Sequence, residues 1–399
     1  MDFYEVSEDE QQRMERLLRR HRKRLLGFPN VHDVDFGFEF TDGAPSGRLA
    51  LRVHVDRKRS LRGLKVADRV PDEIDGVPVD VIEFTPEEQA IPRTAVHVPV
   101  RGGVRLANVM SAGGGTLGMI VFDRDTLQPL AISNNHVMNR TPDLAPAVRG
   151  DLMSQPGPNQ APDVLGPVTR LDVALDCAVC SIGNRAWTLD MYGVGDVTGW
   201  APAQLGKKVM KSGLTTGVTW GVIDGMNSGG FTIVPDTSVP ASGQMSLPGD
   251  SGSIWMELTT NRAVGLHFAG NTTGPERASA KHLDQVMNKL NVLVFDGAAI
   301  GRAVIGSACR VRARTAPGAT CSLSVVYPSG RRSSAKGLGT KTADTSGWVE
   351  WTWFIGTHTK RVGAGTGSPL GFPIRATVSF PGGGTRLLER PLEGTTSTS

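Results

Sequence analysis

Residues 246–253, SLPGDSGS, constrain the fold more than any other stretch of the chain. Gly249 and Gly252 bracket Ser251, and glycine adopts backbone conformations that a Cβ disfavours, so the segment predicts a tight turn. Such a turn aims the backbone N–H groups of Gly249 and Ser251 at one point, where an oxyanion would be stabilised. We expect Asp250 to hold the turn from behind. Ser251 is therefore a candidate nucleophile, which needs a base and a group that orients the base.

Two apolar segments upstream supply these groups. Residues 130–138, LAISNNHVM, run from an apolar stretch into His136, and residues 173–179, VALDCAV, place Asp176 in an apolar run. The order His136, Asp176, Ser251 is one of the chain orders in which catalytic triads occur. Asp172 lies in the same region and is a rival for the orienting role.

These motifs resemble those of one protein class. SNNHV, LDCAV and GDSGS are similar to the three triad motifs of bacterial trypsin-like serine proteases, and residues 209–223, VMKSGLTTGVTWGVI, to a strand that opens their second barrel. The pattern most resembles the NAL1-like trypsin-like peptidases of plants and bacteria. The resemblance implies a mainly β fold with a chymotrypsin-like double β-barrel, a triad of His136, Asp176 and Ser251, and an oxyanion hole at Gly249 and Ser251. LDCAV favours Asp176 over Asp172.

A second resemblance concerns the substrate pocket. Residues 264–270, VGLHFAG, are similar to a strand of bacterial glutamyl endopeptidases whose histidine contacts the substrate carboxylate. The resemblance implies a pocket with Ser246 and His267, and a preference for Glu over Asp on the acyl side of the cleaved bond. Residues 243–248 contain no acidic residue, so a basic substrate side chain would lack a counter-charge. Met245 keeps a hydrophobic preference open, and a structural role for His267 is a further alternative.

The chain is long enough for several domains, and its composition and residue patterns change along its length. The periodicity of apolar residues and the turn signals predict the following parts: a basic amphipathic helix at 1–27, a small α/β domain at 28–86, a linker at 87–104, the protease domain at 105–298, an immunoglobulin-like β-sandwich at 299–394 and a disordered tail at 395–399. We expect few contacts across residues 296–299, so that the sandwich is a separate unit.

Several elements within these parts have their own signals. Ser7 is the predicted N-cap of a helix over residues 7–26, and the exposed face of this helix is basic. Strands are expected at 31–40, 49–56 and 77–84. An amphipathic helix is predicted over residues 278–290. Trp351 and Trp353 share one face of a predicted sandwich strand and Trp348 takes the other, and core packing is the preferred interpretation over a ligand surface.

The chemistry of the remaining residues excludes several classes of protein. Cys177 and Cys180 are three residues apart on a predicted strand, so they face opposite ways and neither a metal site nor a disulfide is expected there. The absence of a secretory signal predicts a cytoplasmic location, in which Cys309 and Cys321 stay reduced. We expect no cofactor, no metal and no membrane span. A net charge of +4 is too small to predict nucleic-acid binding.

The sequence therefore predicts a serine endopeptidase whose partner is a protein or peptide substrate. The basic helix and the sandwich are candidate surfaces for a further partner protein. Two alternatives remain open at this point: a catalytically silent binding or scaffold protein on a protease fold, and an esterase or amidase that uses the same triad.

Overall fold

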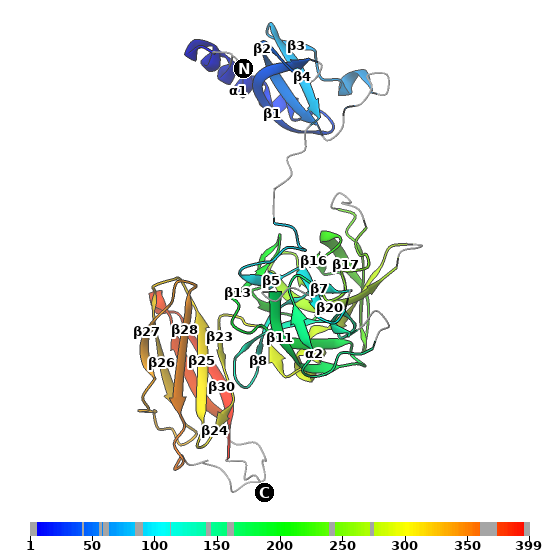
Figure 1. The fold of residues 1–399 in the computed structure, drawn as a ribbon. Coiled ribbons are helices and arrows are strands. Elements are labelled where there is room, and N and C mark those ends of the chain that lie inside the picture. The colour runs from blue at the N-terminus through cyan, green and yellow to red at the C-terminus, as the bar shows by residue number, and fades with distance from the viewer. Residues whose placement is uncertain are drawn as a thin grey trace. The chain divides into compact units, whose positions relative to one another are not determined.

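A computed structural model describes residues 6–41, 44–55, 58, 64–83, 91–111, 113–140, 145–157, 163–238, 244–271, 275–359 and 373–394. The chain divides into two compact units, residues 1–90 and 91–399, and each is described by itself. Strands dominate both units (Figure 1), which confirms the mainly β fold class predicted from the sequence.

The first unit packs one helix against a four-stranded sheet. Helix α1 (Glu8–Leu25) begins at a capping box, in which the Ser7 side chain accepts from the Glu10 N–H and the Glu10 carboxylate accepts from the Ser7 N–H. Met14, Leu17 and Leu25 face a core shared with the sheet, whereas the basic residues stay outside it. The sheet has the order β1-β2-β4-β3, with β2 and β4 parallel. Its strands are β1 (Val31–Thr41), β2 (Ala44–Val55), β3 (Glu73–Ile74) and β4 (Val77–Glu83), and a 3-10 helix spans Val66–Asp68.

The second unit begins with a six-stranded barrel. Its sheet runs β22-β8-β9-β12-β11-β10-β6-β7, in which β22 is an extra strand beside β8. Only Gly118 separates β7 from β8, so the two count as one barrel strand, and the chain itself closes the barrel there. The strands are β6 (Val104–Asn108), β7 (Gly115–Leu117), β8 (Met119–Asp123), β9 (Pro129–Ser133), β10 (Leu152–Ser154), β11 (Val164–Asp172) and β12 (Cys177–Ser181), with β22 (Val292–Leu293) added beside β8. A small sheet of β5 (Val100–Gly102), β13 (Trp187–Met191) and β14 (Gly195–Asp196) accompanies the barrel.

The second barrel is closed by a direct pairing of two of its strands, β20 and β21. Its sheet runs β15-β20-β19-β16-β17-β18-β21, and β20 also pairs with β21, which completes a ring of six strands. The strands are β15 (Gly199–Trp200), β16 (Lys208–Gly213), β17 (Gly217–Asn227), β18 (Gly230–Pro235), β19 (Ile254–Glu257), β20 (Arg262–Gly270) and β21 (Ala278–His282). The double β-barrel that the resemblance implied is therefore present.

The helix predicted over residues 278–290 is only half correct. Residues Ala278–His282 form β21, and helix α2 is limited to Leu283–Lys289. The strand is favoured because Ala278 and Ala280 fill the interior of the second barrel while the backbone pairs with both β18 and β20. Helix α2 then buries Leu283, Val286 and Met287 in a core that contains residues of both barrels, such as Ile132 and Leu266.

The C-terminal part is a β-sandwich whose two sheets share one core. One sheet has the order β23-β25-β28 and the other β24-β30-β29-β26-β27. The strands are β23 (Ala298–Ile300), β24 (Ala303–Val304), β25 (Ala308–Arg314), β26 (Thr320–Val326), β27 (Gly339–Thr342), β28 (Trp348–Phe354), β29 (Pro373–Ser379) and β30 (Thr385–Glu393). Trp351 and Trp353 are fully buried in this core, in agreement with the packing role preferred for them. The tail at 395–399 lies outside the described residues.

The sandwich does contact the first barrel, through an aromatic cluster and an ion pair. Trp348 leaves the sandwich core and packs against Phe122, Trp187 and Phe295, with ring centroids 4.7–5.7 Å apart. Arg390 also pairs with Asp125 at 2.8 Å. An alternating strand directs Trp348 away from the face of Trp351 and Trp353, which gives the sandwich an apolar contact with the first barrel.

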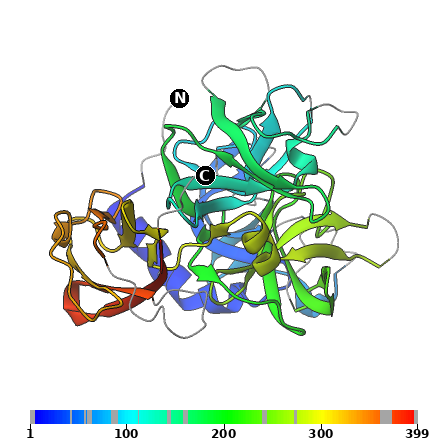
Figure 2. The same ribbon diagram turned by 90° about the horizontal axis from the view of Figure 1, so that it is seen from below.

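Part of the predicted linker at 87–104 also belongs to the folded unit. Residues 87–90 lie outside the described residues, but Val100–Gly102 forms β5 and Val104 begins β6. Arg93 donates to the Gly103 carbonyl and to the Ser212 hydroxyl, so this segment contacts the second barrel. Seen from below, the barrels and the sandwich are distinct groups of strands (Figure 2). No helix in the described ranges combines the length and the apolar character needed to cross a membrane.

Candidate functional site

The three motif segments come together where the two barrels face each other. Strand β9 of the first barrel ends at Ser133 and leads into the 3-10 helix His136–Met138, and Asp176 directly precedes β12. The turn that carries Ser251 directly precedes β19 of the second barrel. The Thr116 N–H of the first barrel donates to the Ser251 carbonyl at 2.9 Å. The turn is therefore held against the first barrel, on the side of His136.

Asp176 holds the backbone and the ring of His136 at once. Its Oδ1 accepts from the His136 N–H at 3.0 Å, and its Oδ2 lies 2.7 Å from His136 Nδ1. Asp176 has a left-handed backbone, with φ of 53°, and Asn134 Nδ2 donates to its carbonyl at 2.9 Å. Because a carboxylate accepts only, the Nδ1 of His136 carries a proton, and Nε2 is left as the acceptor of the neutral ring.

Asp172, the rival orienting group, is engaged elsewhere. Its carboxylate pairs with Lys289 at 2.9 Å and accepts from the Leu175 N–H at 2.7 Å. The Lys289 side chain and that backbone bond lower the pKa of Asp172. Of the two aspartates, the structure therefore brings Asp176 and not Asp172 to the histidine.

Close approach of the His136 and Ser251 segments depends on a glycine. A Cβ built at Gly115 would lie 2.7 Å from Val137 and 2.9 Å from the Ser251 carbonyl oxygen. In the described part of the chain, the Ser251 hydroxyl donates to the Phe268 carbonyl at 3.4 Å and makes no hydrogen bond to His136. Rotation about one side-chain bond redirects a serine hydroxyl. The hydrogen bond from a catalytic serine to its histidine is often formed only when substrate is present.

The turn presents two backbone donors that the chain does not use. Within the described ranges, the N–H groups of Gly249 and Ser251 have no acceptor, whereas those of Leu247, Asp250 and Gly252 are all bonded. Gly249 has φ of 103°, a left-handed value that suits glycine. The Thr116 hydroxyl donates to the Gly249 carbonyl at 2.8 Å, which fixes the peptide orientation. These are the two groups predicted to bind an oxyanion.

Asp250 anchors this turn through a fully buried ion pair with Lys211. Lys211 Nζ lies 3.0 Å from Asp250 Oδ2, and neither side chain is exposed to solvent. The carboxylate also accepts from the N–H groups of Thr215, Thr216 and Leu247 at 2.9–3.1 Å and from the Thr216 hydroxyl at 2.6 Å. Burial by itself would raise the pKa of Asp250, but the Lys211 charge and these donors lower it. Sequence reasoning missed Lys211; the one available signal was its position two residues after Val209 on a predicted strand, which puts both residues on the same face.

His267 and Ser246 contact each other, but the histidine is a neutral core residue. It is 1% exposed, its Nε2 lies 2.8 Å from Ser246 Oγ, and its Nδ1 accepts from Trp255 Nε1 at 3.3 Å. Burial lowers the pKa of His267 to about 3, and the Lys211 charge adds to this effect. The expected partly charged donor is therefore absent. The proton lies on Nε2 and is donated to Ser246, so the serine hydroxyl remains free to donate onward.

Among the described residues, neither the cysteines nor a cluster of metal ligands provides a second reactive centre. Burial raises the pKa of the thiols of Cys177, Cys180 and Cys309 to about 12, which makes them poor nucleophiles. All four cysteines are free. The described parts of the chain hold no group of three or more His, Cys, Asp or Glu side chains that could bind a metal ion.

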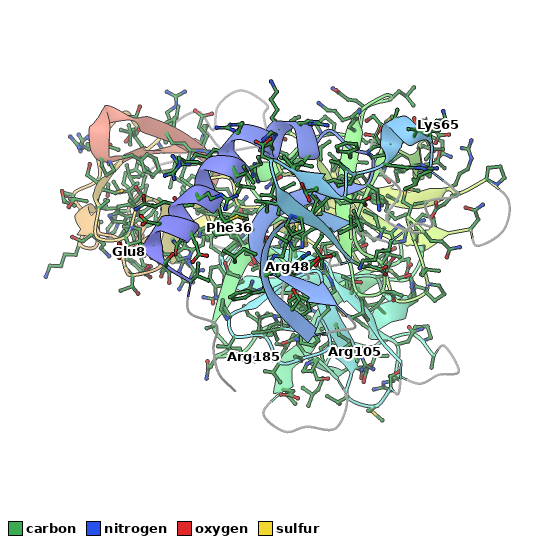
Figure 3. The ribbon with its side chains drawn as sticks, turned by 90° about the horizontal axis from the view of Figure 1, so that it is seen from above. Glu8, Phe36, Arg48, Lys65, Arg105 and Arg185 are labelled. Atoms are coloured by element: carbon green, nitrogen blue, oxygen red, sulfur yellow. The ribbon has the colours of Figure 1, made fainter. Side chains whose placement is uncertain are left out.

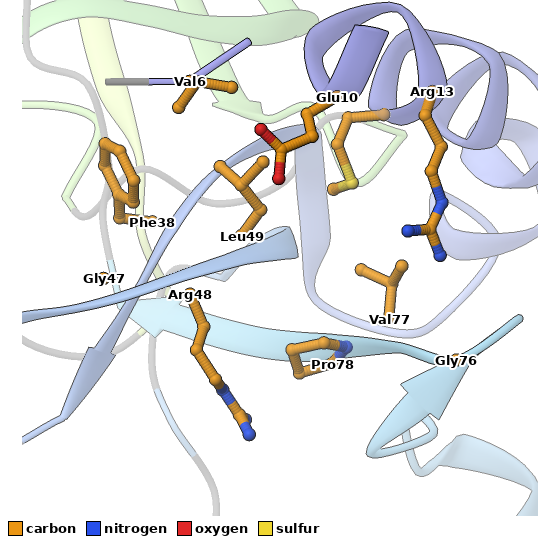
Figure 4. A pocket seen from close by; sticks show the side chains of 11 residues that line it. Val6, Glu10, Arg13, Phe38, Gly47, Arg48, Leu49, Gly76, Val77 and Pro78 are labelled. Carbon is orange, nitrogen blue, oxygen red and sulfur yellow. The ribbon is translucent and has the colours of Figure 1, made fainter. Parts of the chain in front are cut away.

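A separate cavity of about 380 Å³ lies in the first unit, between α1 and the strands β2 and β4. Figure 3 shows α1, which begins at Glu8, beside the strand that carries Arg48. In the close view, Leu49 and Val77 form an apolar floor, and Glu10 and Arg13 extend from the helix above them (Figure 4). Arg48 is already paired with Glu39 at 3.0 Å. The cavity has no nucleophile or base in a triad arrangement.

No family model and no curated protein sequence matches the chain. Among solved structures, it is similar to a Nocardiopsis protease (TM-score 0.37, 19% identity, 48% of this chain and 97% of that chain covered). It is also similar to Cellulomonas bogoriensis chymotrypsin (TM-score 0.36, 18% identity, 49% and 98%). A third similar structure is that of a glutamic acid specific serine protease that uses a histidine triad in substrate binding (TM-score 0.38, 18% identity, 49% and 100%). These values are low, so any function must be argued from the contacts of His136, Asp176 and Ser251 themselves.

Proposed function

We propose that the chain is a serine endopeptidase of the bacterial trypsin-like kind, with His136, Asp176 and Ser251 as its triad. The observation that carries the proposal is the pairing of Asp176 with His136 opposite a turn whose Gly249 and Ser251 N–H groups have no acceptor in the described chain. A structural aspartate–histidine pair has no need of two aligned, unused donors beside a serine. Nucleophilic acyl transfer needs all of these groups.

The proposed reaction proceeds through an acyl-enzyme. The Ser251 hydroxyl turns from the Phe268 carbonyl to His136 Nε2, which takes its proton as the serine oxygen attacks the substrate carbonyl carbon. The resulting oxyanion accepts from the N–H groups of Gly249 and Ser251, and each such donor contributes about 3 kcal/mol in comparable enzymes. His136 then gives the proton to the leaving amine, and water releases the acyl group by the same steps in reverse order. Asp176 keeps the ring oriented and stabilises its protonated form.

We propose an acidic preference on the acyl side of the cleaved bond, carried by Ser246. Since Trp255 donates to Nδ1 of His267, the ring donates through Nε2 to Ser246, and the Ser246 hydroxyl can donate its own hydrogen bond to a carboxylate. The buried Met245 alongside supports the hydrophobic alternative. Cleavage profiling separates the two, because a preference for Leu or Phe that survives His267→Ala would exclude the acidic pocket.

A serine-directed fluorophosphonate tests the proposed function. The wild-type protein should be labelled and should cleave a peptide library, and Ser251→Ala should lose both properties while it remains folded. Absence of labelling and cleavage in the wild type would favour the alternative of a scaffold protein. Cleavage of esters but of no peptide in the library would favour the esterase or amidase alternative.

Three further parts of the hypothesis are also proposals. We propose that the protein acts in the cytoplasm, that the basic face of α1 or the sandwich recruits a partner protein, and that the sandwich is of the immunoglobulin-like kind. The buried free cysteines Cys309 and Cys321 are compatible with a reducing compartment.

A further inference from the structure

A groove of about 420 Å³ lies on the second barrel, and one residue that lines it, Phe268, is hydrogen-bonded to the candidate nucleophile. Phe268 forms one of its walls, and the carbonyl of the same residue accepts from the Ser251 hydroxyl at 3.4 Å. The hairpin of β17 and β18 and the strand β21 provide the other walls. The residues that line it include Met226, Thr232, Phe268, Ser279 and Lys281.

The alternation of β21 directs Lys281 into this groove. Ala278 and Ala280 are fully buried inside the barrel, so Ser279 and Lys281 point to its outer side. The Lys281 ammonium lies 4.2 Å from the centroid of the Phe268 ring, a cation–π contact that holds the charge beside the residue whose carbonyl accepts from Ser251.

Lys281 differs from most cations around it because no carboxylate neutralises it. Within the described ranges it has no ion pair, whereas Lys207, Lys208, Lys211, Arg277 and Lys289 each have one. The nearby carboxylate of Asp224 is occupied by Arg277 and by the Thr232 hydroxyl. The groove therefore carries a net positive charge together with hydroxyl and apolar surface, a combination that suits an acidic side chain.

We propose that Lys281 binds an acidic side chain of the peptide substrate, at a position close to the cleaved bond but not the residue on its acyl side. This inference rests on the proposed peptidase function. An extended peptide advances about 3.3–3.6 Å per residue, so a groove that starts at the partner of Ser251 is within reach of side chains about two to four residues from the bond. The residue on the acyl side is assigned to Ser246 instead, whose neighbour His267 has no charge.

Internally quenched peptides test the assignment. They share one sequence and differ by a single Glu, Gln or Lys placed in turn at each of the four positions on either side of the bond. The value of kcat/KM is measured for wild type, Lys281→Ala, Lys281→Glu and Arg262→Ala. Arg262 is the matched control, an exposed cation at the opposite end of β20 with no ion pair in the described ranges.

We expect wild type to prefer Glu over Gln by about tenfold at one position other than the acyl-side residue, as for a charge-assisted hydrogen bond. Lys281→Ala should lose this preference, Lys281→Glu should prefer Lys there, and Arg262→Ala should match wild type. An equal loss on every peptide would mean that Lys281 acts on the Asp176–His136 pair, and would overturn the inference. An acidic preference confined to the acyl-side residue would overturn it too. Absence of any cleavage that depends on Ser251 would instead overturn the proposed function.

Discussion

At the scale of single residues, hydrogen bonds and ion pairs distinguish the two aspartates near His136. Asp176 accepts from both the N–H and the ring of His136, whereas Asp172 pairs with Lys289. If Asp176 orients the base, its amide variant holds the wrong tautomer, because an amide nitrogen would face Nδ1.

We therefore predict that Asp176→Asn lowers kcat by about 10⁴-fold, by analogy with triads of the same geometry. Asp172→Asn is the matched control and should leave kcat within about twofold, since it removes a surface ion pair. Steady-state kinetics on a peptide substrate measures both. The reverse result, with the larger loss in Asp172→Asn, would mean that the wrong aspartate has been assigned.

The neutral His267 predicts a particular dependence of stability on pH. Its folded pKa of about 3 lies below the ordinary value of 6.5, because the ring is buried. Between these two values the unfolded chain binds a proton that the folded protein does not, so stability rises with pH and is complete above about pH 6.5. Urea unfolding from pH 3 to pH 7 should show that His267→Gln loses less stability on acidification than wild type does. Identical slopes in the two proteins would contradict a buried neutral ring.

At the scale of structural elements, the tight turn before β19 depends on the strand β16 through Lys211. Lys211→Met would leave the Asp250 carboxylate buried without its counter-ion, which costs about 3–5 kcal/mol in comparable cases. Turnover should fall as well, because the Gly249 and Ser251 donors belong to the same turn. Lys208→Met is the control on the same strand. The Lys208 side chain is half exposed, and its partner Asp236 keeps the Ser238 N–H and hydroxyl as donors, so the loss should cost less than that of Lys211.

Chemical denaturation and peptide kinetics measure the two effects. The double variant Lys211→Met with Asp250→Asn should recover much of the stability, because it removes the unpaired charge. If Lys211→Met were as stable and as active as wild type, the buried pair would not be what holds the turn.

Local sequence patterns predicted some elements well and others poorly. The turn at 246–253 and the capping box of α1 were predictable because short-range chemistry determines them: Gly249 and Gly252 in one case, Ser7 and Glu10 in the other. Residues 278–290 were misread as a single helix because β21 is determined by partners far away in the sequence, β18 and β20. The neutrality of His267 likewise depends on Trp255, which approaches it only in the closed barrel.

At the scale of the whole molecule, the aromatic contact of Trp348 joins the sandwich to the first barrel. The sequence contained no signal for this contact, because an alternating strand specifies only that Trp348 faces away from Trp351. Phe122 in the centre of the cluster is fully buried, so the first barrel relies on the Trp348 ring, which the sandwich supplies.

We predict that Trp348→Ala lowers the free energy of unfolding by about 2–3 kcal/mol, below the usual range for a fully buried ring because Trp348 is half-buried. It should also accelerate limited proteolysis near residue 300. Phe354→Ala, at the exposed end of the same strand, is the control and should change neither. Thermal unfolding and timed digestion give the two readouts. Unchanged stability in Trp348→Ala would mean that the sandwich and the barrels are independent after all.

The pairing of β22 with β8 has a consequence for the order of events during synthesis. Val292 and Leu293 complete the edge of a barrel that begins near residue 104, so that edge waits until both barrels have left the ribosome. At ordinary rates of translation the delay after β8 is on the order of ten seconds. Throughout this interval the apolar rim of the nascent first barrel is uncovered, and Ser251 has not yet met a finished partner surface.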